Sequence, residues 1–245
     1  MPNPPIALEL SVVVPVHNEE GAVGALATEV EQALAPLGHA WECIWVDDGS
    51  TDRTVAVLAE HLPGSRHRLL ELQRNSGQSA ALMAGFRAAR GRFIATLDGD
   101  GQNNPADLMG MLARLRVGDV DAVNGIRAKR RDTWVRRVSS RIANAYRNGL
   151  TGEQVTDVGC AIRVFRRECT DFLPVFKGMH RYLPTLLRLH GFTITEMPVS
   201  HRPRETGRTK YGIHTRLWVG LADTLAICWM QRRVAVPRVK RELPE

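Results

Sequence analysis

Short apolar runs alternate with segments of helical period along the first part of the chain. The runs are rich in β-branched residues and end at turn-forming residues, which is typical of buried strands. The segments between them repeat apolar residues every three or four positions, as helices do. We expect strands at Leu10–Val16, Trp41–Val46, Arg68–Leu72 and Phe93–Leu97, and helices at Glu20–Ala35, Thr51–Leu62 and Gln78–Ala89. This alternation predicts an α/β fold with a mostly parallel sheet flanked by helices.

The rest of the chain is less regular. We expect helices at Pro105–Leu115, Trp134–Leu150 and Arg216–Arg233, and strands at Asp121–Ile126, Ala161–Phe165 and Phe192–Val199. No change of composition marks a linker. The sequence therefore predicts one domain over residues 1–211, followed at 212–245 by an apolar C-terminal helix and a basic tail.

Polar clusters follow three of the expected strands. They are Pro15–Glu19, Asp47–Ser50 and Asp98–Gln102. Ligands of open α/β sheets bind at the carboxyl ends of the strands, so these clusters are candidates for a binding site. For the second cluster alone, a turn followed by a helix cap at Ser50, Thr51 or Asp52 is an equally good interpretation.

The third cluster carries the most specific chemistry. Asp98 and Asp100 are two positions apart, so on an extended segment their carboxylates point the same way. Hard oxygen ligands without cysteine or histidine suit Mg²⁺ or Mn²⁺, and Gln102 could add another oxygen. The alternative is a polar loop in which Asp98 caps the helix at Pro105, although Asn104 is the better placed cap.

A metal at this edge would suit a diphosphate leaving group. Negative charge develops on the diphosphate as its bond to a sugar breaks, and a divalent cation stabilises that charge. Asp48, in the second cluster, has a separate role in this hypothesis. Its carboxylate can accept hydrogen bonds from a base N–H or a ribose hydroxyl, as acidic residues of dinucleotide folds do.

These motifs resemble the signature of family 2 glycosyltransferases, which have the GT-A (Rossmann-like) fold. The resemblance is carried by VVPVHNE at 13–19, VDDGSTD at 46–52 and DGDGQ at 98–102, and it is supported by NSGQ at 75–78. The segments DVGCAIR at 157–163 and RPRETGRTKY at 202–211 are similar to the polyprenyl-phosphate branch, which includes dolichyl-phosphate mannose synthase. Gly99, Gly101 and the Asn pair before Pro105 depart from many relatives, which puts the donor preference in doubt.

The resemblance implies a role for each matching position. The nucleotide-sugar would be contacted by Pro15, His17, Glu19, Val46, Asp48, Asp98 and Gly99, although His17 fits a packing role equally well. The metal would be held by Asp100 and Gln102, and the lipid phosphate would be met by Arg202, Arg204 and Lys210 on a mobile loop. Catalytic candidates are Asp98, Arg127, Asp157 and Arg204. Asp157 would orient an arginine or the sugar, or would be a buried carboxylate paired with Arg163 or a backbone N–H.

The expected activity is that of a metal-dependent hexosyl- or N-acetylhexosaminyltransferase. It would move a sugar, with inversion, from a UDP- or GDP-sugar to undecaprenyl or dolichyl phosphate. One alternative within the family is transfer to a sugar hydroxyl in polysaccharide or lipopolysaccharide synthesis, which needs a general base. An alternative of another class is a basic nucleic-acid-binding protein, but the chain has no Walker A motif, aromatic RNA-binding motif or zinc finger.

Charge and apolar patterning bear on where the protein acts. The net charge is +7, and residues 127–147 carry eight basic residues against one acid, which favours anionic partners or a solvated helix surface. Four scattered cysteines and a start that does not resemble a signal peptide predict a cytoplasmic protein. The longest apolar run, Leu217–Met230, is too short to span a bilayer. Its tryptophans and basic flanks predict peripheral contact with an anionic membrane, or packing on the domain or another subunit; the oligomeric state is open.

Overall fold

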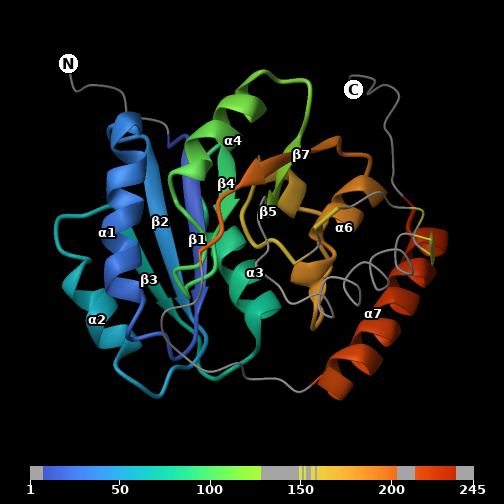
Figure 1. Cartoon of the computed structure of the whole chain (residues 1–245), viewed down its shortest axis with the longest axis horizontal. Helices are drawn as coiled ribbons and strands as arrows, with labels where there is room; N and C mark the ends of the chain where they lie inside the picture. Colours follow the sequence, from blue (N-terminus) through green and yellow to red (C-terminus); the bar gives the residue numbers. More distant parts are fainter. Residues whose placement is uncertain are drawn as a thin grey trace, which may run out of the picture.

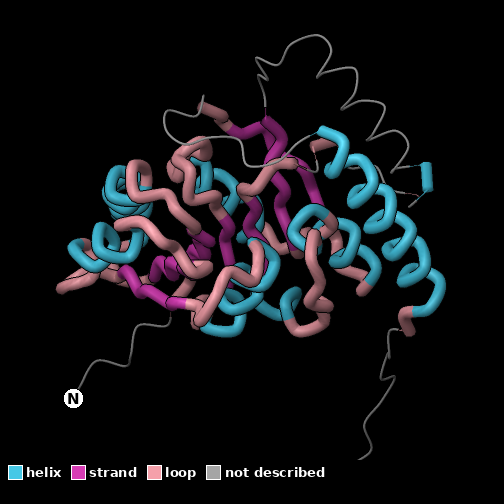
Figure 2. Tube along the Cα trace, turned by 90° about the horizontal axis from the view of Figure 1, so that it is seen from below, coloured by secondary structure: helices cyan, strands magenta, loops and turns pink. Residues whose placement is uncertain are grey.

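The computed structural model describes residues 8–127, 149–150, 152, 156–157, 159–202 and 213–235. It contains a mixed sheet flanked by helices (Figures 1 and 2). The strands are β1 Leu10–Val16, β2 Trp41–Asp47, β3 His67–Glu71, β4 Phe93–Thr96, β5 Ala122–Arg127, β6 Arg163–Arg166 and β7 Ile194–Val199. The helices are α1 Val23–Leu34, α2 Thr54–Glu60, α3 Gln78–Ala88, α4 Asp107–Arg116, α6 Leu183–Leu189 and α7 Ile213–Arg233. Short 3-10 turns are η1 Ala35–Leu37, η2 Arg167–Thr170 and η3 Met179–Arg181.

The strand order is β3-β2-β1-β4-β6-β5-β7. The first four strands are parallel, as the strand–helix alternation predicts. Strand β6 runs antiparallel to both β4 and β5, while β7 is parallel to β5. The single reversed strand separates the regular N-terminal half of the sheet from the half built by the less regular part of the sequence.

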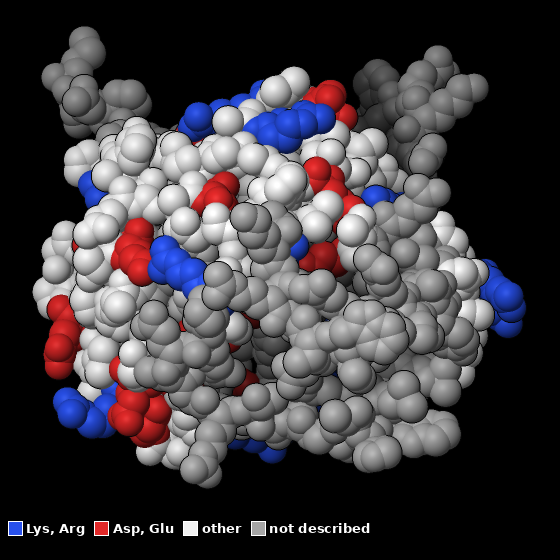
Figure 3. Space-filling model, viewed as in Figure 1, with Lys and Arg blue, Asp and Glu red and all other residues white. Residues whose placement is uncertain are grey.

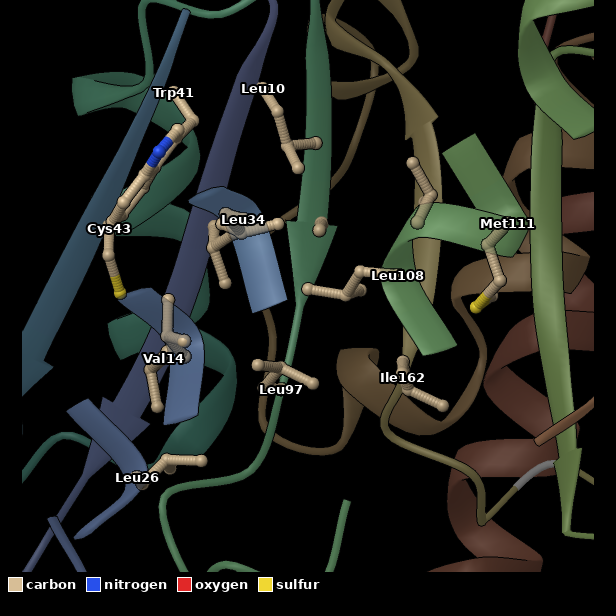
Figure 4. Packing of buried hydrophobic residues seen from close by; sticks show 14 of the residues in the cluster. Leu10, Val14, Leu26, Leu34, Trp41, Cys43, Leu97, Leu108, Met111 and Ile162 are labelled. Atoms are coloured by element: carbon tan, nitrogen blue, oxygen red, sulfur yellow. The ribbon is translucent and has the colours of Figure 1, made fainter. Parts of the chain in front are cut away.

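Two apolar clusters cover the two faces of the sheet. Alternate residues of β1 divide between them, because successive side chains of a strand point to opposite faces. Val12 and Val14 pack with α1 and α4 (Figure 4), whereas Val13 packs with α3 and α6. Helix α7 joins the second cluster through Ile227 and lies at the opposite end of the molecule from α2 (Figure 1).

The element boundaries differ from the expected ones for local reasons. Helix α2 begins at Thr54 rather than Thr51, because the Asp52 carboxylate accepts the Thr54 N–H at 3.0 Å and holds the preceding residues in a bend. Strand β6 begins at Arg163, two residues later than expected. Helix α6 is absent from the sequence prediction, and the expected helix at 134–150 lies outside the described residues except for its last two.

The helix predicted at Arg216–Arg233 is confirmed as α7, which starts slightly earlier, at Ile213. Among the described residues, no helix is both long and apolar enough to cross a bilayer. The division at residue 211 stays a prediction, since the residues around it lie outside those described.

The contact between α3 and the sheet depends on Gly85. A Cβ atom at this position would lie 2.3 Å from Val13 Cγ1 and 3.1 Å from Val46 Cγ2. We predict that Gly85→Ala lowers the free energy of unfolding by about 1–3 kcal/mol, because neither side chain has room to move in a packed core. Urea unfolding measures the change.

Gly220→Ala in α7 is the matched control, since a Cβ there meets no atom within 4 Å. Its higher helix propensity should raise the free energy of unfolding by up to about 1 kcal/mol. Equal effects of the two substitutions would contradict the close approach of α3 to β1.

Candidate active site

The fold brings the three polar clusters to one edge of the sheet. Strands β1 and β2 are parallel and in register, with Val16 opposite Asp47, so the turns that follow them meet. Asn18 N–H donates to Ser50 Oγ at 2.9 Å, and Asn18 Oδ1 accepts the Thr51 N–H at 2.8 Å. Asn18 adopts a left-handed conformation with φ 55°, which asparagine tolerates better than most residues.

The third cluster packs directly on this pair of turns. A Cβ atom at Gly99 would lie 2.6 Å from Val16 Cγ1 and 3.1 Å from the Pro15 carbonyl oxygen. Only glycine therefore allows the loop after β4 to approach the end of β1 this closely. The predicted convergence of the three clusters is present in the structure.

The nucleotide candidates lie along this edge in different surroundings. Pro15 and Val46 face each other across β1 and β2, and the Val46 side chain is buried against α3. A ligand contact at Val46 would therefore use its backbone. His17 and Glu19 are half-buried in the turn after β1, where the Glu19 N–H donates to Thr54 Oγ1 at 2.9 Å. Their contact with a nucleotide stays a prediction.

The second cluster forms the turn that was one interpretation of it, although the helix that follows, α2, has no side-chain cap at Ser50, Thr51 or Asp52. Asp47 Oδ2 accepts the N–H groups of Gly49 and Ser50 at 3.1 and 3.0 Å, as an aspartate of a turn does. Asp48 behaves differently. Its two oxygens accept the N–H groups of Ser76 and Gly77 at 2.6 and 2.8 Å, and only 4% of the residue is exposed.

Asp48 thus positions the loop before α3, a role that its neighbours in sequence do not indicate. A carboxylate has about four lone-pair sites, so these two bonds leave it able to accept a further hydrogen bond from a base or ribose. The nucleotide contact predicted for Asp48 remains a prediction.

Asp98 and Asp100 lie close enough to influence each other. Burial, and then the charge of the neighbouring Asp100 carboxylate, raise the pKa of Asp98 to about 6, although Arg163, Gln78 and Arg127 act to lower it. Asp98 Oδ1 accepts the Gln78 Nε2–H at 2.8 Å, and Asp100 Oδ1 accepts the Gln102 N–H at 3.2 Å. Asn104, rather than Asp98, accepts the Ala106 N–H before α4.

Two converging carboxylates fit a divalent cation, which would offset their repulsion and the cost of burying Asp98. Among the described residues, no group of three or more carboxylate, histidine or cysteine side chains could hold a metal. The fit is therefore to an ion that also takes oxygens from water and from a substrate phosphate, as Mg²⁺ does.

Residues 201–202 bind to the loop after β4, residues 98–103, which we call the acidic loop. The Arg202 N–H donates to the Gln102 carbonyl at 2.9 Å, the Gln102 Nε2–H donates to the Arg202 carbonyl at 3.3 Å, and Asn103 forms a β-bridge with His201. The Arg202 guanidinium pairs with Glu29 of α1 at 2.7 Å. Arg204 and Lys210 lie outside the described residues. The described part of the segment that carries them ends at Arg202, next to the proposed metal ligand Gln102.

Asp157 binds the other catalytic candidate, Arg127. The two side chains form a bidentate pair, with both N···O distances 2.7 Å, and the Asp157 carboxylate also accepts the Arg127 backbone N–H at 3.2 Å. Both side chains are largely buried. Of the interpretations offered for Asp157, the structure thus shows a buried carboxylate that orients an arginine, and that arginine is Arg127.

A hollow of about 230 Å³ lies beside Asp98. Its polar lining comes from Gln78, Asp98, Arg163, His180 and Arg181. His180 Nδ1 is 2.9 Å from Ser79 Oγ, and burial, then Arg181 and Arg163, lower the pKa of His180 to about 3. The spacing of His180 from the other histidines does not suit a metal site, so sequence reasoning assigns it no ligand role, and its contact with the distant Ser79 is not visible in the sequence. A larger hollow of about 590 Å³ is lined in part by Arg87 and Arg167. It lies at the other end of β4, because the Arg167 N–H donates to the carbonyl of Arg92, the residue before that strand.

The fold and this edge define an α/β protein with a polar, acidic ligand site at the ends of parallel strands. Residues 11–172 match the family described as glycosyl transferase family 2, and the chain belongs to this family. The family and the GT-A fold expected from the sequence are confirmed.

Two relatives are similar over most of the chain. Dodecaprenyl-phosphate galacturonate synthase of Rhizobium johnstonii is 39% identical over 96% of this chain and 71% of its own length. Undecaprenyl-phosphate 4-deoxy-4-formamido-L-arabinose transferase of Edwardsiella ictaluri is 36% identical over 83% of this chain and 63% of its own length. The chain thus spans about two thirds of these relatives.

Solved structures share the fold at lower identity. Glucosyl-3-phosphoglycerate synthase from Mycobacterium tuberculosis, in complex with Mn²⁺, uridine diphosphate and phosphoglyceric acid, has a TM-score of 0.69 and 20% identity over 94% of this chain and 80% of its own. The same enzyme in complex with Mg²⁺ and uridine diphosphate has a TM-score of 0.68, also at 20% identity, over 94% and 81%.

Proposed function

We propose that this chain transfers a sugar from a nucleotide-sugar to a polyprenyl phosphate with inversion at the anomeric carbon. The observation that carries the proposal is the contact between Gln102 of the acidic loop and Arg202, the first residue of the basic segment 202–210. It brings a site for a donor diphosphate next to a segment suited to an acceptor phosphate. The printed names of both relatives, a dodecaprenyl-phosphate synthase and an undecaprenyl-phosphate transferase, support the same acceptor class.

The donor lies along the acidic edge in this proposal. Pro15, His17, Glu19, Val46 and Asp48 contact the nucleotide, and Gly99 lets the diphosphate approach the backbone. Asp100 and Gln102 hold Mg²⁺ or Mn²⁺ beside Asp98, and the cation, when bound, stabilises the charge of the departing diphosphate. Structural relatives crystallised with Mn²⁺ or Mg²⁺ and uridine diphosphate support this choice of ions.

The acceptor needs little activation. The second pKa of a phosphate monoester is about 6, so the acceptor is mostly a dianion, and thus a nucleophile, at neutral pH. Its oxygen forms a bond to the anomeric carbon while the bond to the diphosphate breaks and the electron pair leaves with the diphosphate. The repulsion between the two phosphate groups is offset by basic side chains. These are Arg127, which Asp157 holds in place, and Arg202, Arg204 and Lys210.

The structure gives the alternatives less support. Transfer to a sugar hydroxyl needs a general base, and both oxygens of Asp157, the candidate for that role, bind Arg127. A nucleic-acid-binding protein would present a continuous basic surface. On the face shown in Figure 3, acidic and basic side chains of the described residues are interspersed, and the match of residues 11–172 to a glycosyltransferase family is the stronger argument against this alternative.

We predict that Asp100→Asn lowers transfer to undecaprenyl phosphate by roughly 100-fold or more, because a cation at a developing charge contributes several kcal/mol. The assay offers UDP-galacturonic acid, UDP-glucose, UDP-N-acetylglucosamine and GDP-mannose, each with Mg²⁺ or Mn²⁺, and follows the labelled lipid product. A chelator should abolish the activity and added metal should restore it.

Asp119→Asn is the matched control for this assay, because Asp119 is an exposed partner of Arg114 outside the site. It should leave transfer unchanged. Transfer to free sugars but not to the lipid phosphate would favour the sugar-hydroxyl alternative. Full activity of the Asp100→Asn variant in the presence of a chelator would show that transfer does not require a metal.

We further propose that α7 rests on the cytoplasmic face of an anionic membrane. One side of the helix packs on the domain: Ile227 is buried, and Thr224 binds the Tyr182 hydroxyl at 2.9 Å. The other side leaves Leu225 55% exposed and Trp229 62% exposed. The basic end of the helix, Arg232 and Arg233, is also exposed. Exposed apolar residues beside basic ones suit the interface of an anionic bilayer, where the lipid acceptor resides.

We predict that the double substitution Leu225→Gln and Trp229→Gln weakens binding to vesicles of phosphatidylethanolamine and phosphatidylglycerol, because it removes two large, exposed apolar side chains of α7. Co-sedimentation measures the bound fraction. Val117→Gln is the control, since Val117 is exposed at the end of α4. Equal sedimentation of the double variant and the wild type would show that this face does not dock on lipid.

A further inference from the structure

We propose that His180 is a fixed, neutral hydrogen-bond donor that recognises a hydroxyl group of the transferred sugar. The inference rests on the proposed function and adds a specificity residue to it. It starts from the hollow beside Asp98, whose lining includes the His180 ring. A donor in this position would distinguish sugars by their hydroxyl pattern.

Ser79 determines which ring nitrogen carries the proton. Its Oγ accepts the N–H groups of Gly178 at 3.2 Å and of His180 itself at 3.5 Å. A hydroxyl has two lone pairs and one proton, so these bonds leave Ser79 its proton to donate. The acceptor is His180 Nδ1, 2.9 Å away. Because Nδ1 accepts, the ring proton of neutral His180 resides on Nε2.

The surroundings keep this ring neutral. Partial burial of the His180 ring, and then the nearby charges of Arg181 and Arg163, lower its pKa and disfavour a positive charge on it. A ring with so low a pKa is a weak general base and, because it is neutral near pH 7, a weak general acid. A ring whose Nε2 carries the proton also has no lone pair there for a metal. The remaining role for Nε2–H is to donate a hydrogen bond.

The hollow suits a sugar ring in size and position. Its volume, about 230 Å³, is below the roughly 300–1,000 Å³ of pockets for drug-sized ligands. It reaches Asp98 at one side, and Gln78, which also lines it, donates to Asp98 Oδ1. A sugar attached to a diphosphate at the acidic loop would therefore enter this hollow. Among the described residues, Nε2 of His180 has no hydrogen-bonding partner.

A donor that the bound sugar covers discriminates strongly, because a substrate that lacks the matching hydroxyl leaves the N–H unpaired. We expect His180→Phe, which keeps a flat ring without the donor, to lower kcat/KM for the preferred donor about tenfold or more. The affinity for the matching nucleoside diphosphate should stay unchanged, since this ligand does not reach the hollow. His180→Gln places an amide N–H near the position of Nε2 and should restore part of the loss.

The decisive experiment measures kcat/KM of the wild type, His180→Phe and His180→Gln. The substrates are the preferred nucleotide-sugar of the four tested above and its monodeoxy analogues. We expect the wild type to have a much lower kcat/KM for one monodeoxy analogue than for the full nucleotide-sugar. His180→Phe should have similar kcat/KM values for the two, because the hydroxyl and its hydrogen-bond donor are then both without a partner to lose. The control, His190→Phe, alters a histidine that binds the Leu186 carbonyl and stacks on Phe172, and it should keep the wild-type selectivity.

Nitrogen-resolved NMR of the wild type tests the tautomer independently, with the Nε2–H form expected. A ring protonated on Nδ1, or a His180→Phe variant that retains wild-type selectivity against every monodeoxy analogue, would overturn the assignment. Equal losses of nucleoside diphosphate affinity and donor use would show a purely structural role and would also overturn it. Absence of transfer from all donors by the wild type would instead contradict the proposed function.

Discussion

The site depends on one electrostatic constraint: two carboxylates held together at the end of β4. Asp98 is buried, and Asp100 next to it raises the cost of its charge, as the raised pKa of Asp98 shows. Such an arrangement is unfavourable by itself and becomes favourable when a divalent cation lies between the carboxylates and a diphosphate. A bound cation would offset this cost, which supports the proposed role of the pair in ligand binding.

The surrounding structure supports this pair from three sides. Gly99 lets the loop pack against the end of β1, and Gln78 of α3 binds Asp98. On the third side, Gln102 exchanges hydrogen bonds with Arg202, where the basic segment begins. The proposed donor and acceptor sites thus meet at one short stretch of backbone.

The sequence predicted the parts of the fold that local pattern determines. The strands of the parallel half are continuous apolar runs, and the polar clusters directly follow three of them, so both their existence and their convergence were predictable. The reversed strand β6 and the short helix α6 were harder, because the sheet pairing of β6 and the tertiary packing of α6 determine them more than periodicity does. The boundary of α2 depends on one local hydrogen bond, from the Thr54 N–H to the Asp52 carboxylate.

The site was predictable where roles follow from neighbouring residues and not where they follow from distant contacts. The paired carboxylates were visible in the spacing of Asp98 and Asp100. The partners of Asp48, Asp157 and His180 were not, because each lies far away in the sequence: Ser76 and Gly77, Arg127 and Ser79. The roles assigned to Arg204 and Lys210 remain predictions, since both lie outside the described residues.

The central claim is that the acidic loop binds a divalent cation together with a nucleotide diphosphate. Anomalous diffraction from crystals grown with Mn²⁺ and uridine diphosphate tests it most directly. The account predicts a manganese peak within coordination distance, about 2.0–2.3 Å, of an Asp100 oxygen and of diphosphate oxygens, next to Asp98. A peak elsewhere, or a diphosphate bound at this edge without manganese, would contradict it.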